Sequence, residues 1–305
     1  MAPDFQIRCA GVWAARMNYR HAFHAGNHCD VLKHAALALV LERLQSKEKP
    51  FAVLDTHAGR GLYDLSSEEA IRSGEFGAGI VRLIGDTGAP SSLQPYLRAV
   101  SACNPFGGDL RWYPGSPLII QAALREGDSA KFCELHPAER QALESAIGKD
   151  ARVKIFERDG YEAVRAFLPP KERRGLVLVD PPFEQPGEYA RLAGVVADGV
   201  ERWASGIFLI WRPIKDEAGH AGFLAAVERL GLKKTLVAEL SVAPRRKDTL
   251  TGSGLFVINP PYGVAKALTE LLPYLANRLA ATPGGGWRIV EQEGGAVTEK
   301  AGVSS

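Results

Sequence analysis

The chain has 305 residues, of which 46% are hydrophobic and 24% are charged, and its formal net charge is +2. This composition indicates a globular protein with one large core or two small ones, and the balanced charge excludes a generally basic protein, so nucleic-acid binding would need local patches. The longest apolar stretch, Ala35 to Leu41, falls far short of the roughly 20 residues that cross a bilayer, which excludes a membrane span.

The two ends of the chain differ from its middle. Residues 1 to 16 hold a short apolar stretch that is too brief for a signal peptide, and we expect an N-terminal extension or an upstream start there. At the other end, Thr282 to Gly286 breaks the last helix, and residues 282 to 305 have little to bury, which predicts a loose tail. The four cysteines stand far apart without a CxxC pair, so we expect reduced thiols in a cytoplasmic protein.

Between these ends, strand-like apolar runs alternate with amphipathic stretches typical of helices. Seven strands are expected, at Phe51–Leu54, Lys131–Glu134, Val153–Phe156, Leu176–Val179, Ile207–Trp211, Thr235–Leu240 and Leu255–Ile258. Helices are expected at Asp30–Gln45, Pro117–Arg125, Ala138–Ile147, Tyr161–Leu168, Tyr189–Trp203, Phe223–Leu230 and Val264–Leu279. This alternation implies right-handed crossovers, and it predicts a doubly wound α/β fold with a mostly parallel sheet covered on both faces.

The last two predicted strands are joined by a polar loop instead of a helix, so one of them must run antiparallel. Five parallel strands, a sixth and a reversed seventh resemble the sheet of the Rossmann-like class I methyltransferases. The segment from about 62 to 112 breaks the alternation with helical pieces and no clear strand, which predicts an inserted helical subdomain. Such long insertions are often functional, so a lid or substrate wall and a purely structural insertion both stay open.

The tetrapeptide Asp180-Pro181-Pro182-Phe183 follows the fourth predicted strand and suits the methylation of an amino group. An exocyclic amine is a poor nucleophile, because its lone pair is delocalised into the aromatic ring. A carboxylate and a backbone carbonyl that accept its two N–H groups would localise the lone pair, and an aromatic side chain would hold the base by stacking. Asp180, the Pro181 carbonyl and Phe183 could supply these three groups. The alternative is a strand end without a function.

A second tetrapeptide, Asn259-Pro260-Pro261-Tyr262, has the same form. It follows the seventh strand, which we expect to be reversed. It should therefore lie at the opposite edge of the sheet from a ligand bound at the carboxyl ends of the parallel strands. Topology favours Asp180 as the catalytic acid.

Acidic residues end the first four predicted strands at one edge of the sheet. Asp55 begins a turn that contains two glycines. Glu134 could accept hydrogen bonds from the hydroxyls of a ribose, and Asp159-Gly160 could accept one from an adenine amino group. Together with Asp180 they predict an adenosyl site beside an amine-binding loop.

Four of the seven histidines lie in one short stretch, His21 to His34. It contains no H-E-x-x-H motif and its one cysteine is isolated, so we expect no metal. This stretch and a series of downstream motifs resemble the RlmJ family of bacterial 23S rRNA adenine-N6 methyltransferases. The motifs that carry the resemblance are Tyr19-Arg20-His21, Phe23-His24-Ala25-Gly26-Asn27-His28, Asp30-Val31-Leu32-Lys33-His34, Leu54-Asp55-Thr56-His57-Ala58-Gly59, Tyr113-Pro114-Gly115-Ser116-Pro117-Leu118, Glu134-Leu135-His136-Pro137, Arg174-Gly175-Leu176, Asp180-Pro181-Pro182 and Ile258-Asn259-Pro260-Pro261.

The resemblance covers about residues 17 to 281. It implies a Rossmann-like methyltransferase domain with a helical insertion, which uses S-adenosylmethionine to methylate N6 of an adenine in 23S rRNA, adenine 2030 by the family's name. The donor-binding residues that it implies are His34, His57, Ser116, Glu134, Asp159, Gly160 and Asp180. For Ser116, the sequence alone favours a helix cap. Phe183 stands where the family often has tyrosine, a change that keeps stacking and loses a phenolic hydrogen bond.

The resemblance also implies that Asp180 accepts the proton and that Tyr19 lies over the substrate. We expect an adenine to be extruded from RNA, to stack on Phe183 and to offer its amino group to Asp180 and the Pro181 carbonyl. His21 and Lys33 are candidates for phosphate or base contacts at the pocket mouth, with an ordinary structural role as the alternative for each.

Short basic runs at Lys47–Lys49, Lys171–Arg174 and Arg245–Lys247 are further candidates for RNA contacts, although such runs are usually solvated loops. We expect a monomer that acts on free or early-assembly rRNA. The other interpretations are an enzyme that methylates a DNA adenine or a protein glutamine, and a noncatalytic RNA-binding module of the same fold.

Overall fold

The structure is a computed structural model that describes residues 20–215, 217–244 and 249–304. The predictions for Tyr19, for the extension at residues 1–16 and for the basic run Arg245–Lys247 lie outside the described residues. No helix in the described part of the chain is both long enough and apolar enough to span a membrane.

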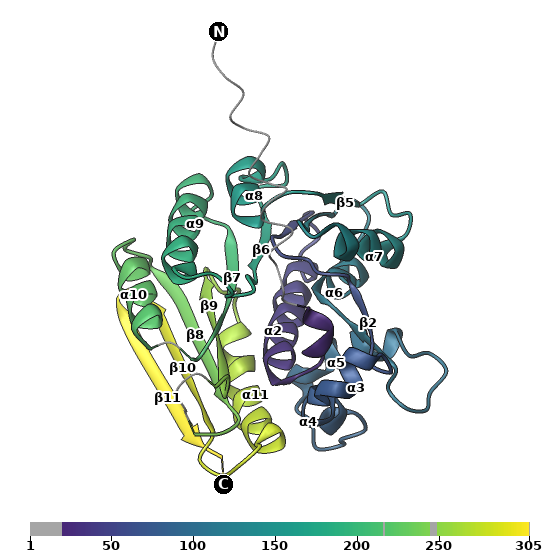
Figure 1. Ribbon diagram of the computed structural model, residues 1–305. Helices are drawn as coiled ribbons and strands as arrows, with labels where there is room; N and C mark the ends of the chain where they lie inside the picture. Colours follow the sequence, from purple (N-terminus) through teal and green to yellow (C-terminus); the bar gives the residue numbers. More distant parts are fainter. Residues whose placement is uncertain (1–19, 216, 245–248, 305) are drawn as a thin grey trace.

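One nine-stranded sheet forms the centre of the protein, in the order β11-β10-β8-β9-β7-β6-β1-β4-β5 (Figure 1). Its strands are β1 (Ala52–Asp55), β4 (Ser129–Cys133), β5 (Val153–Phe156), β6 (Gly175–Val179), β7 (Ile207–Pro213), β8 (Lys234–Ser241), β9 (Gly252–Ile258), β10 (Gly286–Glu293) and β11 (Ala296–Val303). The five strands from β5 to β7 are parallel, and β9 lies antiparallel between β7 and β8. The predicted α/β fold is confirmed, and the seventh predicted strand is the reversed one.

The C-terminal segment corrects the sequence analysis, because the loose tail predicted at residues 282–305 is wrong. β10 pairs antiparallel with β8, and β11 pairs antiparallel with β10, so this segment adds two strands to the seven that were predicted. Ile289 is buried and Trp287 packs against the core. The sequence hides this because the segment holds few apolar residues, and its main partner is the otherwise open edge of β8, which is distant in the chain.

Helices cover both faces of the sheet. The core on one face takes in residues of α2 (His28–Gln45), α6 (Ser116–Ala123), α7 (Pro137–Ile147) and α11 (Val264–Leu279). The core on the other face takes in residues of α8 (Gly160–Phe167), α9 (Glu188–Arg202) and α10 (Glu217–Glu228). The crossovers therefore alternate in the way that the sequence predicted for a doubly wound sheet.

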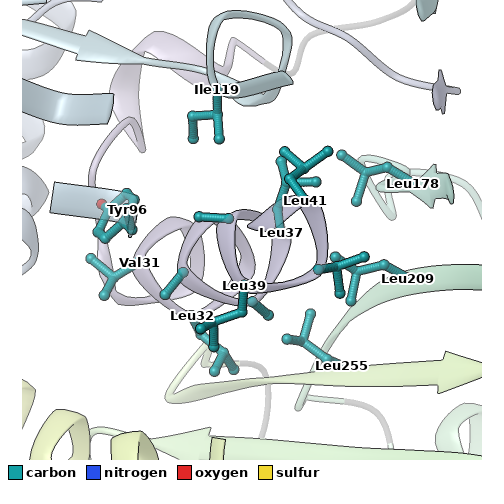
Figure 2. Close-up of a cluster of buried hydrophobic side chains, with 14 of the residues drawn as sticks. Val31, Leu32, Leu37, Leu39, Leu41, Tyr96, Ile119, Leu178, Leu209 and Leu255 are labelled. Atoms are coloured by element: carbon teal, nitrogen blue, oxygen red, sulfur yellow. The ribbon is translucent and has the colours of Figure 1, made fainter. Parts of the chain in front are cut away.

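Helix α2 is buried on nearly all sides, although it lies outside the alternating pattern. It packs against α5 (Gln94–Ala102), α6 and α11, and it contacts β7 and β9. Its apolar residues point in several directions around the axis, and Val31, Leu37 and Leu39 lie in one continuous core (Figure 2). A helix that is apolar all round belongs inside a protein. The Asn27 side chain caps its first turn by accepting hydrogen bonds from the Cys29 and Asp30 amides, and this turn carries the polar residues described below.

The inserted segment lies between two short antiparallel strands, β2 (Leu62–Asp64) and β3 (Trp112–Pro114). The sequence analysis found no strand here, because runs of this length show no period. Between them lie α3 (Glu68–Ser73), α4 (Glu75–Ala78), α5, and the 3₁₀ turns η2 (Ile80–Leu83) and η3 (Ser91–Leu93), while η1 (His21–Phe23) precedes α2. The insertion packs on α2 and α11.

Candidate active site

The carboxyl ends of β1 and β6 meet where the order of the strands reverses. β1 pairs in parallel with β6, with Asp55 opposite Leu178, while β4 lies beyond β1 and β7 lies beyond β6. In open α/β sheets, ligands bind in the crevice at this point. Asp180 directly follows β6, so the fold places Asp55 and Asp180 together at the crevice.

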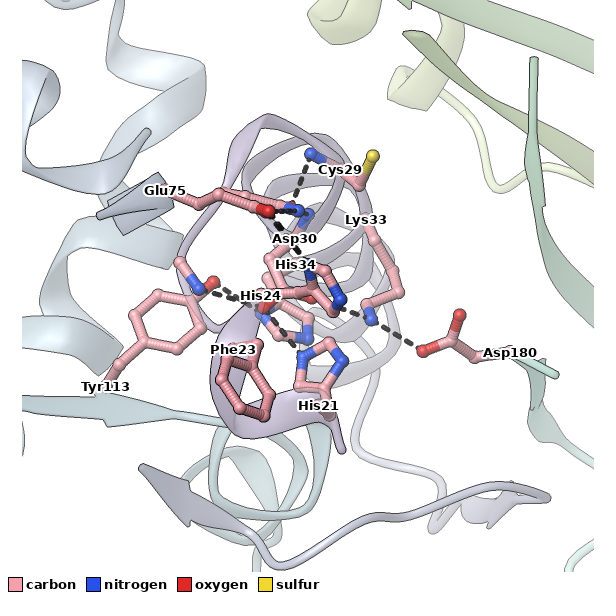
Figure 3. Close-up of polar contacts among 12 residues, drawn as sticks. His21, Phe23, His24, Cys29, Asp30, Lys33, His34, Glu75, Tyr113 and Asp180 are labelled. Atoms are coloured by element: carbon pink, nitrogen blue, oxygen red, sulfur yellow. Dashed lines mark hydrogen bonds and ion pairs between the residues drawn. The ribbon is translucent and has the colours of Figure 1, made fainter. Parts of the chain in front are cut away.

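A buried ion-pair network joins Asp180 to the first turns of α2, and Figure 3 shows the Lys33 side chain reaching from the helix to this carboxylate. The Lys33 ammonium lies 2.5 Å from Asp180 Oδ2 and 2.9 Å from Asp30 Oδ1. Asp30 Oδ2 accepts a hydrogen bond from the Gly26 amide at 3.0 Å and lies 2.9 Å from His21 Nε2. Among the described residues, Lys33 is the one hydrogen-bond donor to the Asp180 side chain, and it occupies Oδ2, so Oδ1 is available to a substrate amine.

Burial and charge oppose each other in this network. Burial acts against the Lys33 charge, but the Asp180 and Asp30 carboxylates outweigh it and raise the pKa of Lys33 well above its ordinary value. Burial acts against the Asp30 charge as well, yet His21 and Lys33 hold the pKa of Asp30 well below its ordinary value. The Lys33 side chain is only 6% exposed. The predicted position of Lys33 at the pocket mouth is therefore wrong, because ion pairs with Asp30 and Asp180 stabilise its ammonium in the protein interior.

The Asp180-Pro181-Pro182-Phe183 loop has a constrained shape. Pro181 is buried, and Phe183 is partly buried. Phe183 has a φ of 52°, a region that aromatic residues rarely adopt. The centroid of its ring lies 4.8 Å from that of Tyr189 and 5.8 Å from that of Trp211. An unfavourable backbone conformation persists only where its surroundings hold it, and such positions cluster at functional sites.

The second tetrapeptide, Asn259-Pro260-Pro261-Tyr262, makes structural contacts with the backbone of another loop. Asn259 Nδ2 donates hydrogen bonds to the carbonyl oxygens of Ala204 and Gly206, both at 2.8 Å, and Tyr262 is 95% exposed. Because β9 runs antiparallel to β7, its carboxyl end lies at the edge of the sheet opposite Asp180. The sequence argument from topology is confirmed in this respect.

Glu134 and Gly160 have surroundings that suit an adenosyl group. Glu134 accepts hydrogen bonds from the Gly59 amide at 2.8 Å and the His136 amide at 2.7 Å, one on each oxygen, so each oxygen can still accept from a hydroxyl. Burial raises the pKa of Glu134. A Cβ at Gly160 would collide with the Thr56 carbonyl oxygen. Only glycine lets α8 begin so close to the β1 turn, and the residues present therefore fit the group.

Asp159 and His57 flank this position. Asp159 caps α8 by accepting hydrogen bonds from the Tyr161 and Glu162 amides, and its Oδ2 lies 2.7 Å from an Arg191 nitrogen. An adenine amino group would share that oxygen. The His57 ring lies edge-on to Tyr161, with 5.2 Å between centroids, and burial lowers its pKa to about 4. The ring is therefore neutral near pH 7.

Ser116 and His34 lie deeper than the other predicted donor-binding residues. Ser116 is the first residue of α6 and caps no backbone amide; it donates to Asp55 Oδ2 at 2.7 Å, so the helix-cap interpretation is wrong. Its hydroxyl is oriented by a carboxyl whose pKa burial raises to about 7. His34 is 1% exposed, its Nδ1 lies 2.7 Å from the Tyr113 hydroxyl, and burial lowers its pKa to about 3. Each of the two therefore contacts a buried neighbour, Asp55 and Tyr113 respectively.

Three residues that hold predicted site residues in place were not predicted from the sequence. Asp30 forms an ion pair with Lys33, and Arg191 forms one with Asp159. The Tyr113 hydroxyl forms a hydrogen bond with His34. Only the first had a local signal, since Asp30 and Lys33 lie three residues apart on one helix. No group of three or more His, Cys, Asp or Glu side chains in the described part of the chain is placed to hold a metal ion.

Comparison with known proteins identifies the family. Residues 48–291 match the family model described as RsmJ, Ribosomal RNA large subunit methyltransferase D, RlmJ. The chain belongs to this family. Ribosomal RNA large subunit methyltransferase J of Escherichia coli (strain K12) is 42% identical over 264 residues, which cover 86% of this chain and 94% of the relative. The protein of the same name from Haemophilus influenzae is 41% identical over 274 residues, covering 90% and 98%.

A solved structure agrees. The crystal structure of protein LPL1258 from Legionella pneumophila superposes with a TM-score of 0.79 at 30% identity, and it covers 92% of this chain and 99% of that one. The RlmJ-family resemblance seen in the sequence is therefore confirmed, as is the prediction of an rRNA methyltransferase enzyme. Neither a DNA methyltransferase nor a noncatalytic module is favoured. Membership of a methyltransferase family implies S-adenosylmethionine as the methyl donor.

Proposed function

We propose that this RlmJ-family protein methylates N6 of an adenine in 23S rRNA, with Asp180 as the group that accepts hydrogen bonds and the proton from the amine. The position of Asp180 carries the proposal. It lies at the reversal of strand order, its Oδ2 is fixed by the buried Lys33, and two prolines lead from it to Phe183. S-adenosylmethionine, when bound, supplies an electrophilic methyl group.

Residues around β1, β4 and α8 bind the methyl donor. Glu134 accepts from the ribose hydroxyls, Asp159 accepts from the adenine amino group, and the close backbone at Gly160 forms the floor. His57 borders this position as a neutral ring. Ser116 and His34 support it from behind, through Asp55 and Tyr113 respectively.

The loop after β6 activates the adenine amino group. Asp180 Oδ1 and the Pro181 carbonyl accept the two N–H groups of the adenine amine, and Phe183 holds the base by stacking. Lys33 is a positioning residue, because its ion pair with Oδ2 sets the direction of Oδ1. Asp180 or a water molecule then takes the surplus proton.

The segment before α2 contacts the RNA. The His21 side chain is 20% exposed and is oriented by Asp30, so one edge of the ring can face the substrate. Tyr19, two residues before His21 in the sequence, lies outside the described residues and is kept in the proposal as a substrate-side residue. The protein acts as a monomer on free or early-assembly rRNA, which light scattering of the purified protein and assays on naked rRNA against assembled subunits would test.

The deciding experiment measures methyl transfer from labelled donor to 23S rRNA that lacks the modification, with the product located by nuclease digestion and mass spectrometry. The wild type should produce N6-methyladenine at one position. Asp180→Ala and Asp180→Asn should lower turnover by about 100-fold or more, because they remove an acceptor that acts in the transition state. Because both changes also weaken the buried ion pair with Lys33, turnover is compared per folded molecule, with the folded fraction measured by circular dichroism.

Glu184→Ala is the matched control, since Glu184 is an exposed acid in the same loop. It should leave turnover unchanged. Near-normal methylation by Asp180→Ala would overturn the assignment of Asp180, and a product other than N6-methyladenine would overturn the reaction.

A further inference from the structure

A groove of about 510 Å³ lies beside the proposed catalytic loop, between α9 and α10. These two helices lie side by side on one face of the sheet (Figure 1). Three aromatic residues line it, of which Phe183 in the loop is partly exposed, while Tyr189 in the first turn of α9 and Phe223 in α10 are nearly buried. Its volume falls within the range of about 300–1,000 Å³ that is typical of small-molecule sites.

The groove adjoins the loop that carries the proposed site for the target base. Phe183 lines it and also stands three residues after Asp180, so one side chain borders both places. The Phe183 ring is held against Tyr189 and Trp211, with centroid distances of 4.8 Å and 5.8 Å. Since α9 and α10 both begin after parallel strands, the groove starts at the edge of the sheet where Asp180 lies.

Internal packing does not account for the open space. A Cβ added at Gly222, within α10, would meet no atom within 4 Å. Glycine in a helix costs about 1 kcal/mol relative to alanine, so the chain gains nothing in the folded protein by leaving this position bare. Two further small residues line the groove, Ala226 on α10 and Ala193 on α9. Small side chains on both helices therefore leave the groove open.

The charges on the groove fit a nucleotide. Lys215 and Arg229 line it and are exposed. Among the lining residues that the structure describes, the one acid is Glu188, which is 6% exposed and accepts a hydrogen bond from the Tyr161 hydroxyl at 2.5 Å. A partly exposed aromatic ring, here Phe183, with accessible cations nearby is a combination by which proteins hold an unstacked base and its phosphate.

We infer that this groove binds an unpaired nucleotide of the substrate RNA that flanks the methylated adenine. The inference rests on the proposed function. Phe183 then separates the target base from its neighbour, and recognition extends beyond the adenine itself. A base that stacks on an aromatic wall contributes roughly 10-fold or more to affinity, given about 1–3 kcal/mol for each stacked base.

Gly222→Leu tests the groove, because it fills the space with no clash at Cβ and with better helix propensity. Gly194→Leu is the matched control, since Gly194 is an exposed glycine in α9, a Cβ there also meets nothing within 4 Å, and it does not line the groove. Gly222→Leu should raise the KM for rRNA about 10-fold, with donor affinity, melting temperature and turnover at saturating RNA close to those of Gly194→Leu. Equal KM values for the two variants would overturn the inference.

A short RNA hairpin with an abasic residue at each position next to the target adenine identifies the nucleotide. Removing the base that occupies the groove should raise the wild-type KM by a similar factor and should add little to the effect of Gly222→Leu, because both changes remove one contact. Fully additive effects at every position, or a loss of donor affinity in Gly222→Leu, would overturn the inference. These results are separable from a failure of the proposed function, which would show as absent N6-methyladenine in the wild type.

Discussion

The loops Asp180-Pro181-Pro182-Phe183 and Asn259-Pro260-Pro261-Tyr262 have nearly the same sequence and different surroundings. Asp180 ends a parallel strand at the reversal of strand order and meets a buried ammonium, whereas Asn259 ends the reversed strand and meets two backbone carbonyls. Phe183 packs on Tyr189 and Trp211, while Tyr262 is 95% exposed. The direction of the preceding strand, and not the motif, decides which loop can face a ligand.

Local geometry separates the two loops as well. The left-handed residue is the aromatic Phe183 in one loop and Asn259 in the other, with φ of 52° in each. Asparagine adopts this region readily, whereas a bulky residue there is an outlier. The unfavourable conformation thus lies in the loop assigned to chemistry, where the surrounding aromatic contacts sustain it, and the structural loop uses a residue that tolerates the turn.

Removing the cation that distinguishes the Asp180 loop should have the largest effect. Lys33→Met leaves Asp30 and Asp180 without their shared ammonium in a buried position, and the loss of one partner from a buried pair destabilises a protein by about 3–5 kcal/mol. We expect a lower free energy of unfolding by chemical denaturation and a loss of methyl transfer by the folded fraction. Wild-type stability together with wild-type turnover would show that the network does not position Asp180.

Much of this comparison could be predicted from the sequence, because it depends on chain order. Alternating strands and helices fixed the sheet, and the missing helix between the last two predicted strands identified the reversed one. The network around Asp180 could not be predicted in the same way. Lys33 lies 147 positions away from its partner, and its burial depends on the packing of α2 against five other elements.

The C-terminal strands and the groove could not be predicted from the sequence for the same reason, since both depend on elements that are distant in the chain. β10 forms because β8 offers an open edge, a property of the assembled sheet that no window of sequence displays. The glycines of α10 weaken the helical pattern locally, and their role becomes visible only when α9 is beside them. Local patterns specify the elements here, whereas the site depends on which elements become neighbours.

The opposite exchange, Asn259→Asp, should damage the fold and spare the chemistry. An aspartate tolerates the same backbone conformation but has no N–H to donate, so it faces the Ala204 and Gly206 carbonyls without a hydrogen bond. We expect the free energy of unfolding to fall by about 1–3 kcal/mol, while turnover per folded molecule stays at the wild-type value. Reduced turnover with unchanged stability would instead place this loop in the active site.

The last prediction is a dependence on pH and concerns Asp55, the acid that lies beside Asp180 at the crevice. Burial, with a contribution from the Asp180 charge, raises the pKa of Asp55 from an ordinary 3.8 to about 7, against the Ser116 hydrogen bond that lowers it. The folded protein therefore binds a proton that the unfolded chain releases, and this group's contribution to stability declines as the pH rises from about 4 to about 7, on the order of 1 kcal/mol per pH unit.

Asp55→Asn removes this titration. Relative to wild type, the variant should gain stability steadily between pH 5 and pH 7 and hold that gain at higher pH, as measured by denaturant unfolding at each pH. The difference between the two proteins isolates Asp55 from the buried histidines, which remain in both. A constant difference across this range would mean that Asp55 is ionised throughout, and that the crevice beside Asp180 is more polar than its burial implies.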